Sequence, residues 1–193
     1  RRVHERGMEL AEQLGHREFL CNASVGLWTS HFVRGATSEA YETALRALEL
    51  LPPDSPLRGP AHFAVGGSAQ VLGRPQEAIE HLSIAIESGE SYSLSVGTRT
   101  DIHASAYAAH AYWMLGLDDR AVAMSSDAIR RARAADTPYN LAVALAYSAV
   151  TQQLRNDRDA ARVAVEELTR LCERYNFTYY REWGLLIGGW LQG

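Results

Sequence analysis

Lysine is absent from the sequence: all 19 basic side chains are arginines, and 23 acidic residues outnumber them, so that the formal net charge is −4. A slightly acidic chain has no general positive field to attract nucleic acid or an anionic membrane surface. Arginine keeps its charge at any accessible pH. We interpret the missing lysine as a bias of the coding sequence, without mechanistic meaning.

Cysteine is almost as scarce. The two cysteines, Cys21 and Cys172, lie far apart in the chain, and each falls within a helical pattern among apolar neighbours. A disulfide framework is therefore not expected, and a reducing cytoplasm is the favoured location. In such surroundings a cysteine usually packs as a small apolar side chain.

Long hydrophobic runs are missing as well. No apolar stretch approaches the roughly 20 residues that a transmembrane helix requires. The first residues, "RRVHERGMEL", carry scattered charges and are followed by no apolar core of a signal peptide. The remaining composition, with 193 residues of which 47% are hydrophobic, fits a single globular domain with a sizeable core.

A short phrase recurs along the chain, in which a glycine precedes an alanine by five positions. It occurs as "GATSEA" (35–40), "GRPQEA" (73–78) and "GLDDRA" (116–121), and a fourth copy, "NDRDAA" (156–161), has asparagine in place of glycine. Glycine and asparagine tolerate the left-handed conformation at a helix C-terminus. The polar residues that follow are helix start signals. Each phrase therefore predicts a helix, a tight turn and a second helix.

The four turn residues are 38, 43 and 40 positions apart. A helical hairpin that repeats at such an interval is typical of an α-helical solenoid. Alanines also recur seven positions apart in three of the four second helices, in the pairs Ala40/Ala47, Ala78/Ala85 and Ala121/Ala128. We expect these small side chains to let the returning helix lie close to the first.

The hydrophobic pattern predicts about ten helices and no strands, because no segment alternates with a period of two. The expected helices span residues 2–14, 17–34, 37–51, 57–72, 75–88, 99–115, 118–134, 138–154, 157–175 and 177–191, with "LPPDSP" and "SGESYSLSVG" as breakers. The first helix resembles the second half of a hairpin and the last helix resembles a first half. Since solenoid ends need polar caps, we expect a fragment of a larger protein or a chain that pairs through its ends.

These features resemble tetratricopeptide repeats (TPR). The matching residues are the turn glycines Gly35, Gly73 and Gly116, the alanine pairs, and one repeat-closing proline, Pro52. The repeats are longer than the usual 34 residues, and other residues occupy most of the early Trp and Tyr positions. The resemblance implies an all-α, right-handed helical-hairpin solenoid over residues 1–193.

The whole chain also resembles the helical-repeat region of large bacterial signalling proteins. In these, a STAND-type ATPase is joined to a LuxR-type helix-turn-helix or to a class III nucleotide cyclase. The stretches that carry the resemblance are "RGMELAEQLG", "GLWTSHFVRG", "AHFAVGGSAQVLGRPQEAIEHL", "AYWMLGLDDRAVA" and "YNFTYYREWGLLIGGWLQG". None of the ATPase, cyclase or DNA-reading modules lies within these 193 residues. The resemblance implies a sensor or interaction arm that contacts other domains of its parent.

In such a solenoid the first helices of the hairpins line the concave face, where aromatic and polar side chains can bind a peptide or a small effector. Counting back from each turn residue places ten candidates there: Asn22, Val25, Thr29, Phe32, Phe63, Gln70, His103, His110, Trp113 and Gln153. The alternative is that several of them pack between helices, because apolar residues at helical spacing usually belong to the core.

Other residue patterns indicate no metal site, nucleic-acid site or phosphate loop. His103 and His110 are seven residues apart, too far to share one ion, and no carboxylate or cysteine joins them or His62 and His81 at metal-ligand spacing. We interpret Arg130, Arg131 and Arg133 as a solvated outer face. The glycines of "GLLIGGWLQG" follow no strand and form no phosphate loop; close helix contact explains Gly184 and Gly188 better.

The sequence therefore favours a non-catalytic, cofactor-free module that binds a protein, peptide or small effector. A second hypothesis is an assembly element that forms a homodimer through the solenoid ends. The third and weakest is an enzyme that uses the histidines of the concave face. Direct contact with nucleic acid or a membrane is not expected.

Overall fold

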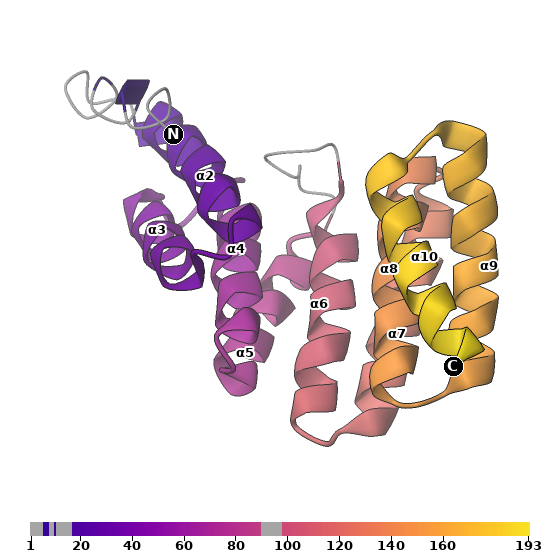
Figure 1. The fold of residues 1–193 in the computed structure, drawn as a ribbon. Coiled ribbons are helices and arrows are strands. Elements are labelled where there is room, and N and C mark those ends of the chain that lie inside the picture. The colour runs from indigo at the N-terminus through magenta and orange to yellow at the C-terminus, as the bar shows by residue number, and fades with distance from the viewer. Residues whose placement is uncertain (1–5, 8–9, 11–16, 90–97) are drawn as a thin grey trace. The chain divides into compact units, whose positions relative to one another are not determined.

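The computed structural model describes residues 6–7, 10, 17–89 and 98–193, and for residues 17–23 and 25 it describes the backbone alone. The described helices are α2 (Arg17–Val33), α3 (Thr37–Leu50), α4 (Arg58–Val71), α5 (Pro75–Glu87), α6 (Thr100–Met114), α7 (Asp118–Ala134), α8 (Pro138–Leu154), α9 (Arg158–Tyr175) and α10 (Thr178–Gln192) (Figure 1). Over these residues the chain contains no β-strand.

The all-α helical-hairpin fold predicted from the sequence is confirmed. Each helix from α2 to α10 begins and ends within one residue of its predicted bounds. The expected helix over 2–14 lies outside the described residues apart from positions 6, 7 and 10. None of the described helices combines the length and the apolar character needed to cross a membrane.

The turn residues adopt the predicted left-handed conformation, with φ of 75° at Gly35, 76° at Gly73, 72° at Gly116 and 58° at Asn156. At Gly73, for example, the glycine amide donates to the Gln70 carbonyl and the next amide donates to Ala69, five residues back. The same pair of bonds recurs at the other three turns. These bonds satisfy carbonyl groups that a helix end leaves without partners.

Two further non-glycine residues adopt the left-handed conformation and were not identified from the sequence. Asp136 and Asn176, with φ of 48° and 57°, lie between the second helix of one hairpin and the first helix of the next. The amide after Asn176, that of Phe177, donates to the Cys172 carbonyl. Asparagine and aspartate are the non-glycine residues that most readily adopt this conformation.

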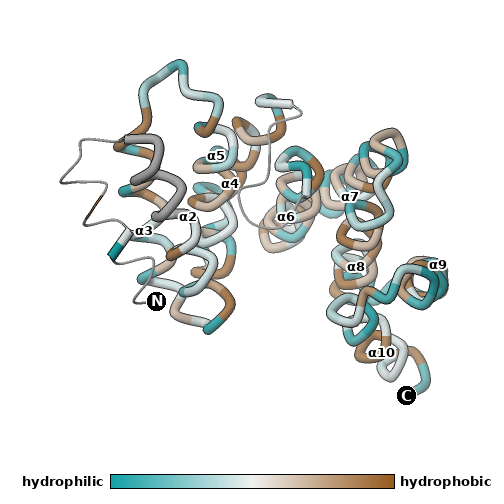
Figure 2. Tube along the Cα trace, turned by 90° about the horizontal axis from the view of Figure 1, so that it is seen from above, coloured by the Kyte–Doolittle hydropathy of each residue, from teal (hydrophilic) through white to brown (hydrophobic). Residues whose placement is uncertain are grey.

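The alanine pairs of the three second helices are buried. All six of these alanines are at most 1% exposed: Ala40, Ala47, Ala78, Ala85, Ala121 and Ala128. The opposite faces of the second helices are polar, and α9 is coloured mainly as hydrophilic in Figure 2. The predicted role of the small residues in close helix packing agrees with this burial.

The chain divides into two compact units, Arg1–Ala104 and Ser105–Gly193, and the division falls within α6. In the first unit, α2, α3 and α4 enclose a core around Trp28, Ala44 and Val65. In the second unit, α8, α9 and α10 lie side by side (Figure 1) around Leu145 and Leu168. The expectation of one solenoid over 1–193 stays a prediction.

Candidate ligand-binding surface

The aromatic groove candidates Phe32 and Phe63 lie among the packing side chains of the first unit. The side chains of Asn22 and Val25 are outside the described residues, and Thr29, Phe32, Phe63 and Gln70 are half-buried. The rings of Phe32 and Phe63 contact Trp28, with centroid distances of 5.3 and 5.9 Å.

His103 stacks on Phe63 at 5.2 Å. Burial lowers the pKa of His103 to about 4, so its ring is neutral near pH 7. In this unit the aromatic candidates therefore contact one another and the core.

The second unit contains the other three candidates, of which only His110 belongs to a described aromatic cluster. Trp113 and Gln153 are half-buried near the ends of α6 and α8. His110 is 8% exposed, and its Nε2 lies 3.1 Å from the backbone carbonyl of Tyr147. Its ring centroid is 5.5 Å from that of Tyr147.

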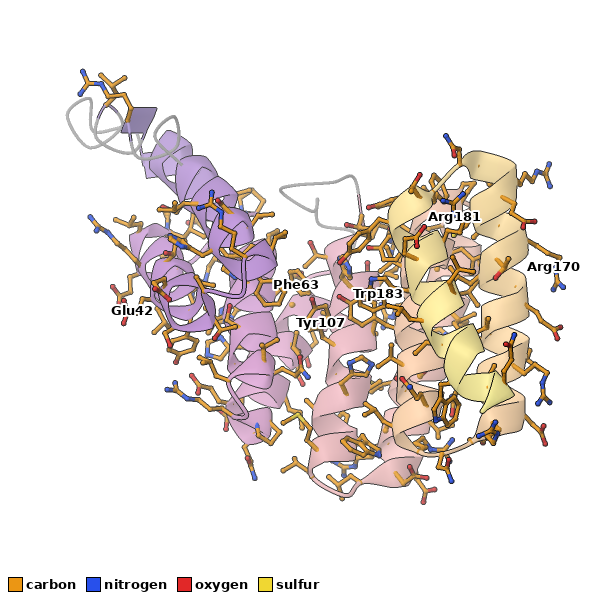
Figure 3. The ribbon with its side chains drawn as sticks, in the orientation of Figure 1. Glu42, Phe63, Tyr107, Arg170, Arg181 and Trp183 are labelled. Carbon is orange, nitrogen blue, oxygen red and sulfur yellow. The ribbon has the colours of Figure 1, made fainter. Side chains whose placement is uncertain are left out.

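Tyr147 is the centre of a continuous line of rings that we call the aromatic row: Tyr107 and His110 on α6, Tyr147 on α8, and Tyr179 and Trp183 on α10. Ring centroids are 4.8 Å apart for Tyr107 and Tyr147, 5.1 Å for Tyr147 and Trp183, and 5.9 Å for Trp183 and Tyr179. Figure 3 labels the members from the two outer helices, Tyr107 and Trp183. Thus the first helices of successive hairpins each contribute a ring.

Three members of the aromatic row, Tyr107, His110 and Tyr147, are uncharged near neutral pH. The Tyr147 hydroxyl donates to the Tyr107 hydroxyl at 2.8 Å. Burial raises the pKa of Tyr107 to about 12 and raises that of Tyr147 well above its ordinary value. Burial also lowers the pKa of His110, against the opposing effect of its bond to the Tyr147 carbonyl. Desolvation acts in each case against the charged form.

Exposure increases along the row. Tyr107 and His110 are buried, Tyr147 and Trp183 are half-buried, and Tyr179 is 64% exposed. The buried rings fix the position of Tyr147 and Trp183, while the α10 end offers aromatic surface to solvent. Such rigid aromatic side chains contribute large contact area at a low cost in conformational entropy.

Four members of the row were not among the sequence candidates: Tyr107, Tyr147, Tyr179 and Trp183. A signal for two of them was present, because Tyr107 and Tyr147 are 40 residues apart, the same interval that separates the turn residues Gly116 and Asn156. Tyr179 follows Tyr139 by the same interval, but Tyr139 is not a member of the row, and Trp183 has no aromatic residue 40 positions before it. Their place in the row follows from how α10 packs on α8 and α9.

The remaining histidine candidates form a pair in the first unit. The Nδ1 atoms of His62 on α4 and His81 on α5 are 2.9 Å apart, so one ring donates a hydrogen bond and the other accepts it. Burial, together with the charges of His81 and Arg58, lowers the pKa of His62 to about 4. Within the described part of the chain, no three His, Cys, Asp or Glu side chains are grouped as metal ligands.

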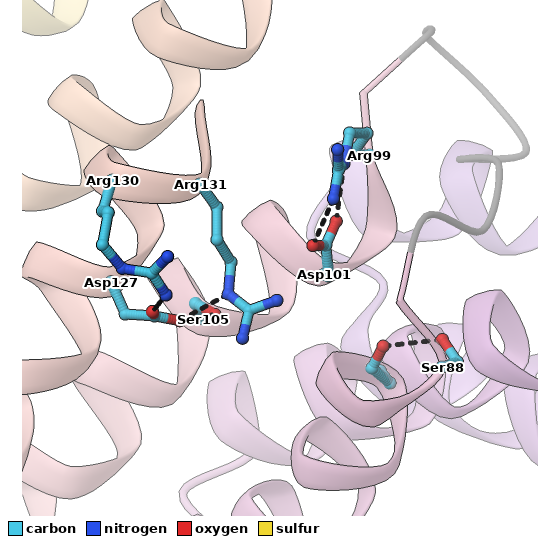
Figure 4. A network of polar contacts seen from close by, with 8 residues as sticks. Ser88, Arg99, Asp101, Ser105, Asp127, Arg130 and Arg131 are labelled. Atoms are coloured by element: carbon cyan, nitrogen blue, oxygen red, sulfur yellow. Dashed lines mark hydrogen bonds and ion pairs between the residues drawn. The ribbon is translucent and has the colours of Figure 1, made fainter. Parts of the chain in front are cut away.

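The arginines of the outer face are engaged by carboxylates. Asp127 bonds to both Arg130 and Arg131 and accepts a bond from the Ser105 hydroxyl (Figure 4). Arg133 on α7 reaches across to Glu167 on α9. The guanidinium groups of Arg131 and Arg130 lower the pKa of Asp127 in spite of its burial.

Cys172 is 1% exposed in the core of the second unit, and burial raises the pKa of its thiol. A protonated, enclosed thiol is a poor nucleophile.

Gly184 approaches α9 closely, since a β-carbon at this position would lie 3.4 Å from the Thr169 hydroxyl.

Comparison with models of known protein families gave no match, and no curated protein matched the sequence.

Proposed function

We propose that this chain is a non-catalytic binding module whose aromatic row captures a peptide segment. The observation that carries the proposal is the unbroken line of ring contacts from α6 through α8 to α10, which ends in the exposed ring of Tyr179. A surface of aromatic rings with few polar groups suits ligand recognition.

The chemistry of the row favours an uncharged, apolar or aromatic segment. Tyr107, Tyr147 and His110 are neutral near pH 7, and their polar atoms are engaged with one another or with backbone. A charged ligand group placed here would lose water without gaining an ionic partner from the row, which costs free energy. Proline, aliphatic or aromatic side chains would instead pack on the rings of Trp183 and Tyr179.

The resemblance to the helical regions of STAND-type regulators extends this proposal to the parent protein. There the module would serve as a sensor arm in the cytoplasm that restrains an ATPase, a DNA-binding domain or a cyclase until an effector engages it. The physical basis would be a shift between two arrangements of the arm, driven by the difference in ligand affinity between them.

The proposal is tested by titration calorimetry of the chain against a panel of neutral peptides rich in proline, aliphatic and aromatic residues, with neutral oligosaccharides alongside. We expect at least one peptide to bind, and Trp183→Ala and Tyr179→Ala to weaken that binding about tenfold or more each, as for aromatic anchors of an interface. Tyr175→Ala is the matched control, because Tyr175 is an exposed aromatic residue (42%) outside the row.

Two results would contradict the proposal. One is a panel in which no ligand gives measurable heat. The other is an equal loss of affinity in the Tyr175→Ala control, which would show that the rings of the row have no particular part in binding.

A second candidate function, assembly through α10, is favoured by a comparison of α10 with α8. The helices follow the left-handed residues Asp136 and Asn176, which lie 40 positions apart, so Leu185 and Leu186 correspond to Leu145 and Ala146. Leu145 and Ala146 are at most 1% exposed and cluster with residues of α9, whereas Leu185 and Leu186 are 60% and 73% exposed. The two positions that are buried on α8 are thus exposed on α10.

We propose that a second copy of the chain covers this face. Light scattering should then show a concentration-dependent dimer that Leu186→Asp weakens. Val163→Asp is the control, because Val163 is similarly exposed (66%) on α9. A monomer at all concentrations, or equal effects of the two variants, would remove this candidate.

A further inference from the structure

The second unit also contains a groove of about 430 Å³ between α7 and α9 and over α8. We call it the α7–α9 groove. Its floor is formed by Leu145, Ser148 and Gln152 of α8. A volume of this size lies within the range of small-ligand and peptide side-chain pockets. None of its lining residues belongs to the aromatic row.

The polar atoms at the floor of the groove are arranged as donors. Ser148 Oγ accepts a hydrogen bond from the Ser125 hydroxyl at 2.9 Å, which leaves the Ser148 hydroxyl proton to donate. The side-chain carbonyl of Gln152 accepts from the Arg155 guanidinium at 2.6 Å, which leaves the Gln152 amide group to donate. A ligand that meets this floor must therefore supply acceptors.

The charged side chains at the mouth of the groove also favour a ligand that supplies acceptors. Arg133 on the α7 wall donates two hydrogen bonds, of 3.0 and 2.9 Å, to Glu167 on the α9 wall. This ion pair is solvent-accessible, with side chains 59% and 31% exposed, so it is weakly held and open to exchange with a competing carboxylate.

A second carboxylate, that of Asp127, lies beside the groove. Asp127 is shared between Arg130, which also lines the groove, and Arg131 (Figure 4). Of the charged side chains that line the groove, Arg130 and Arg133 are positive and Glu167 is negative. Electrostatic complementarity of this kind favours an anionic ligand group.

Apolar groups lie one helical turn away from the charges on both walls. Ile129 precedes Arg133 by four residues on α7, and Val163 precedes Glu167 by four residues on α9. Residues at this spacing are neighbours on one helix face, about 5–6 Å apart. Val163 is 66% exposed, which is high for a large apolar side chain and shows that it faces solvent from the groove wall.

We infer that the α7–α9 groove binds the C-terminal residue of a peptide whose last side chain is aliphatic. The terminal carboxylate replaces Glu167 on Arg133, and the aliphatic side chain packs between Ile129 and Val163 over Leu145. A C-terminal residue carries both groups on one α-carbon, at the short separation that the walls require. An aspartate or glutamate side chain supplies the carboxylate without the adjoining apolar group. This inference does not depend on the proposed function of the aromatic row.

The experiment is an NMR titration of the isotope-labelled chain with acetyl-Ala-Ala-Leu, as the free acid and as the C-terminal amide. We expect the acid to shift resonances of α7, α8 and α9, and the amide to bind about tenfold or more weakly, since it lacks the charge-assisted bonds to Arg133. Arg133→Gln should weaken binding of the acid to a similar extent. Glu167→Gln should strengthen it, because the ligand no longer competes with an internal carboxylate.

Arg162→Gln is the matched control, because Arg162 is an exposed arginine of α9 that pairs with Asp159 outside the groove. Its affinity for the acid should equal that of the unaltered chain. The opposite signs expected for Arg133→Gln and Glu167→Gln separate ligand binding from a loss of stability, which would move both variants in the same direction.

The inference is overturned if the acid does not bind, if the amide binds equally well, or if Glu167→Gln weakens binding. Equal losses for Arg162→Gln and Arg133→Gln would also overturn it, as they would indicate unspecific charge attraction. If Trp183→Ala abolished binding of the tripeptide, the ligand would belong to the aromatic row. That result would contradict the inference about the α7–α9 groove and would be consistent with the proposed function.

Discussion

Close contact between α4 and α5 depends on the missing side chain of Gly66. A β-carbon at this position would lie 2.8 Å from Leu82 Cγ and 3.1 Å from the Ala78 carbonyl oxygen. Leu82 is fully buried, so it has no open space into which to move. The recurring turn phrase did not reveal Gly66, since a glycine inside a helix has no turn to mark.

Gly66→Ala should therefore destabilise the chain by about 1–3 kcal/mol, as expected for overpacking of a dense interface. The control is Gly189→Ala on α10, where a β-carbon would meet nothing within 4 Å. That change should be neutral or stabilise the helix by up to about 1 kcal/mol, because alanine is the better helix former. Chemical denaturation followed by circular dichroism measures both. Equal stability of the two variants would contradict the close contact.

The helices themselves were predictable because their start and stop signals are local. Gly35, Gly73 and Gly116 end their helices through bonds made within six residues, and Pro75 lies at the start of α5. The turns at Asp136 and Asn176 were missed, since these residues are also common in polar loops and helix starts. The end of each helix was nevertheless predictable from where the periodic apolar pattern stops.

Which face of each helix is covered was less accessible to sequence analysis. The apolar residues of α8 and α10 occur at similar positions, yet Leu145 is buried and Leu185 is exposed. Leu145 clusters with Leu168 and Cys172 of α9. On α10 the buried residues are Tyr180, Gly184 and Ile187, which leaves Leu185 on the outer side of the helix. A hydrophobic pattern identifies a face that prefers burial, and only the packed neighbours decide whether it is buried.

At the scale of the whole molecule, buried histidines make the free energy of unfolding depend on pH. Burial lowers the pKa of His62 and of His103 to about 4 and also lowers that of His110. In the unfolded chain these rings titrate near 6.5. Between pH 6.5 and 4 the unfolded state thus binds more protons than the folded state, and stability falls as the pH falls through this window.

The free energy of unfolding should therefore decrease on acidification from pH 6.5 to 4.5, by less than about 1.4 kcal/mol per pH unit for each histidine. Above about pH 7.5 these groups are neutral in both states and contribute almost no slope. His62→Gln removes one contributor and should make the decrease shallower. Urea denaturation at a series of pH values checks this, and an unchanged slope in the variant would contradict the assignment to His62.

The amino-acid sequence alone determined the fold class, the helix bounds and the alanine contacts, because turn residues, helix signals and apolar periodicity act over a few neighbouring positions. Only the tertiary structure decided which side chains gather into a surface. The ring contacts of Tyr147 with Trp183, and the pairing of Arg133 with Glu167, join residues more than 30 positions apart. Such contacts depend on how helices are placed against one another, which no local pattern specifies.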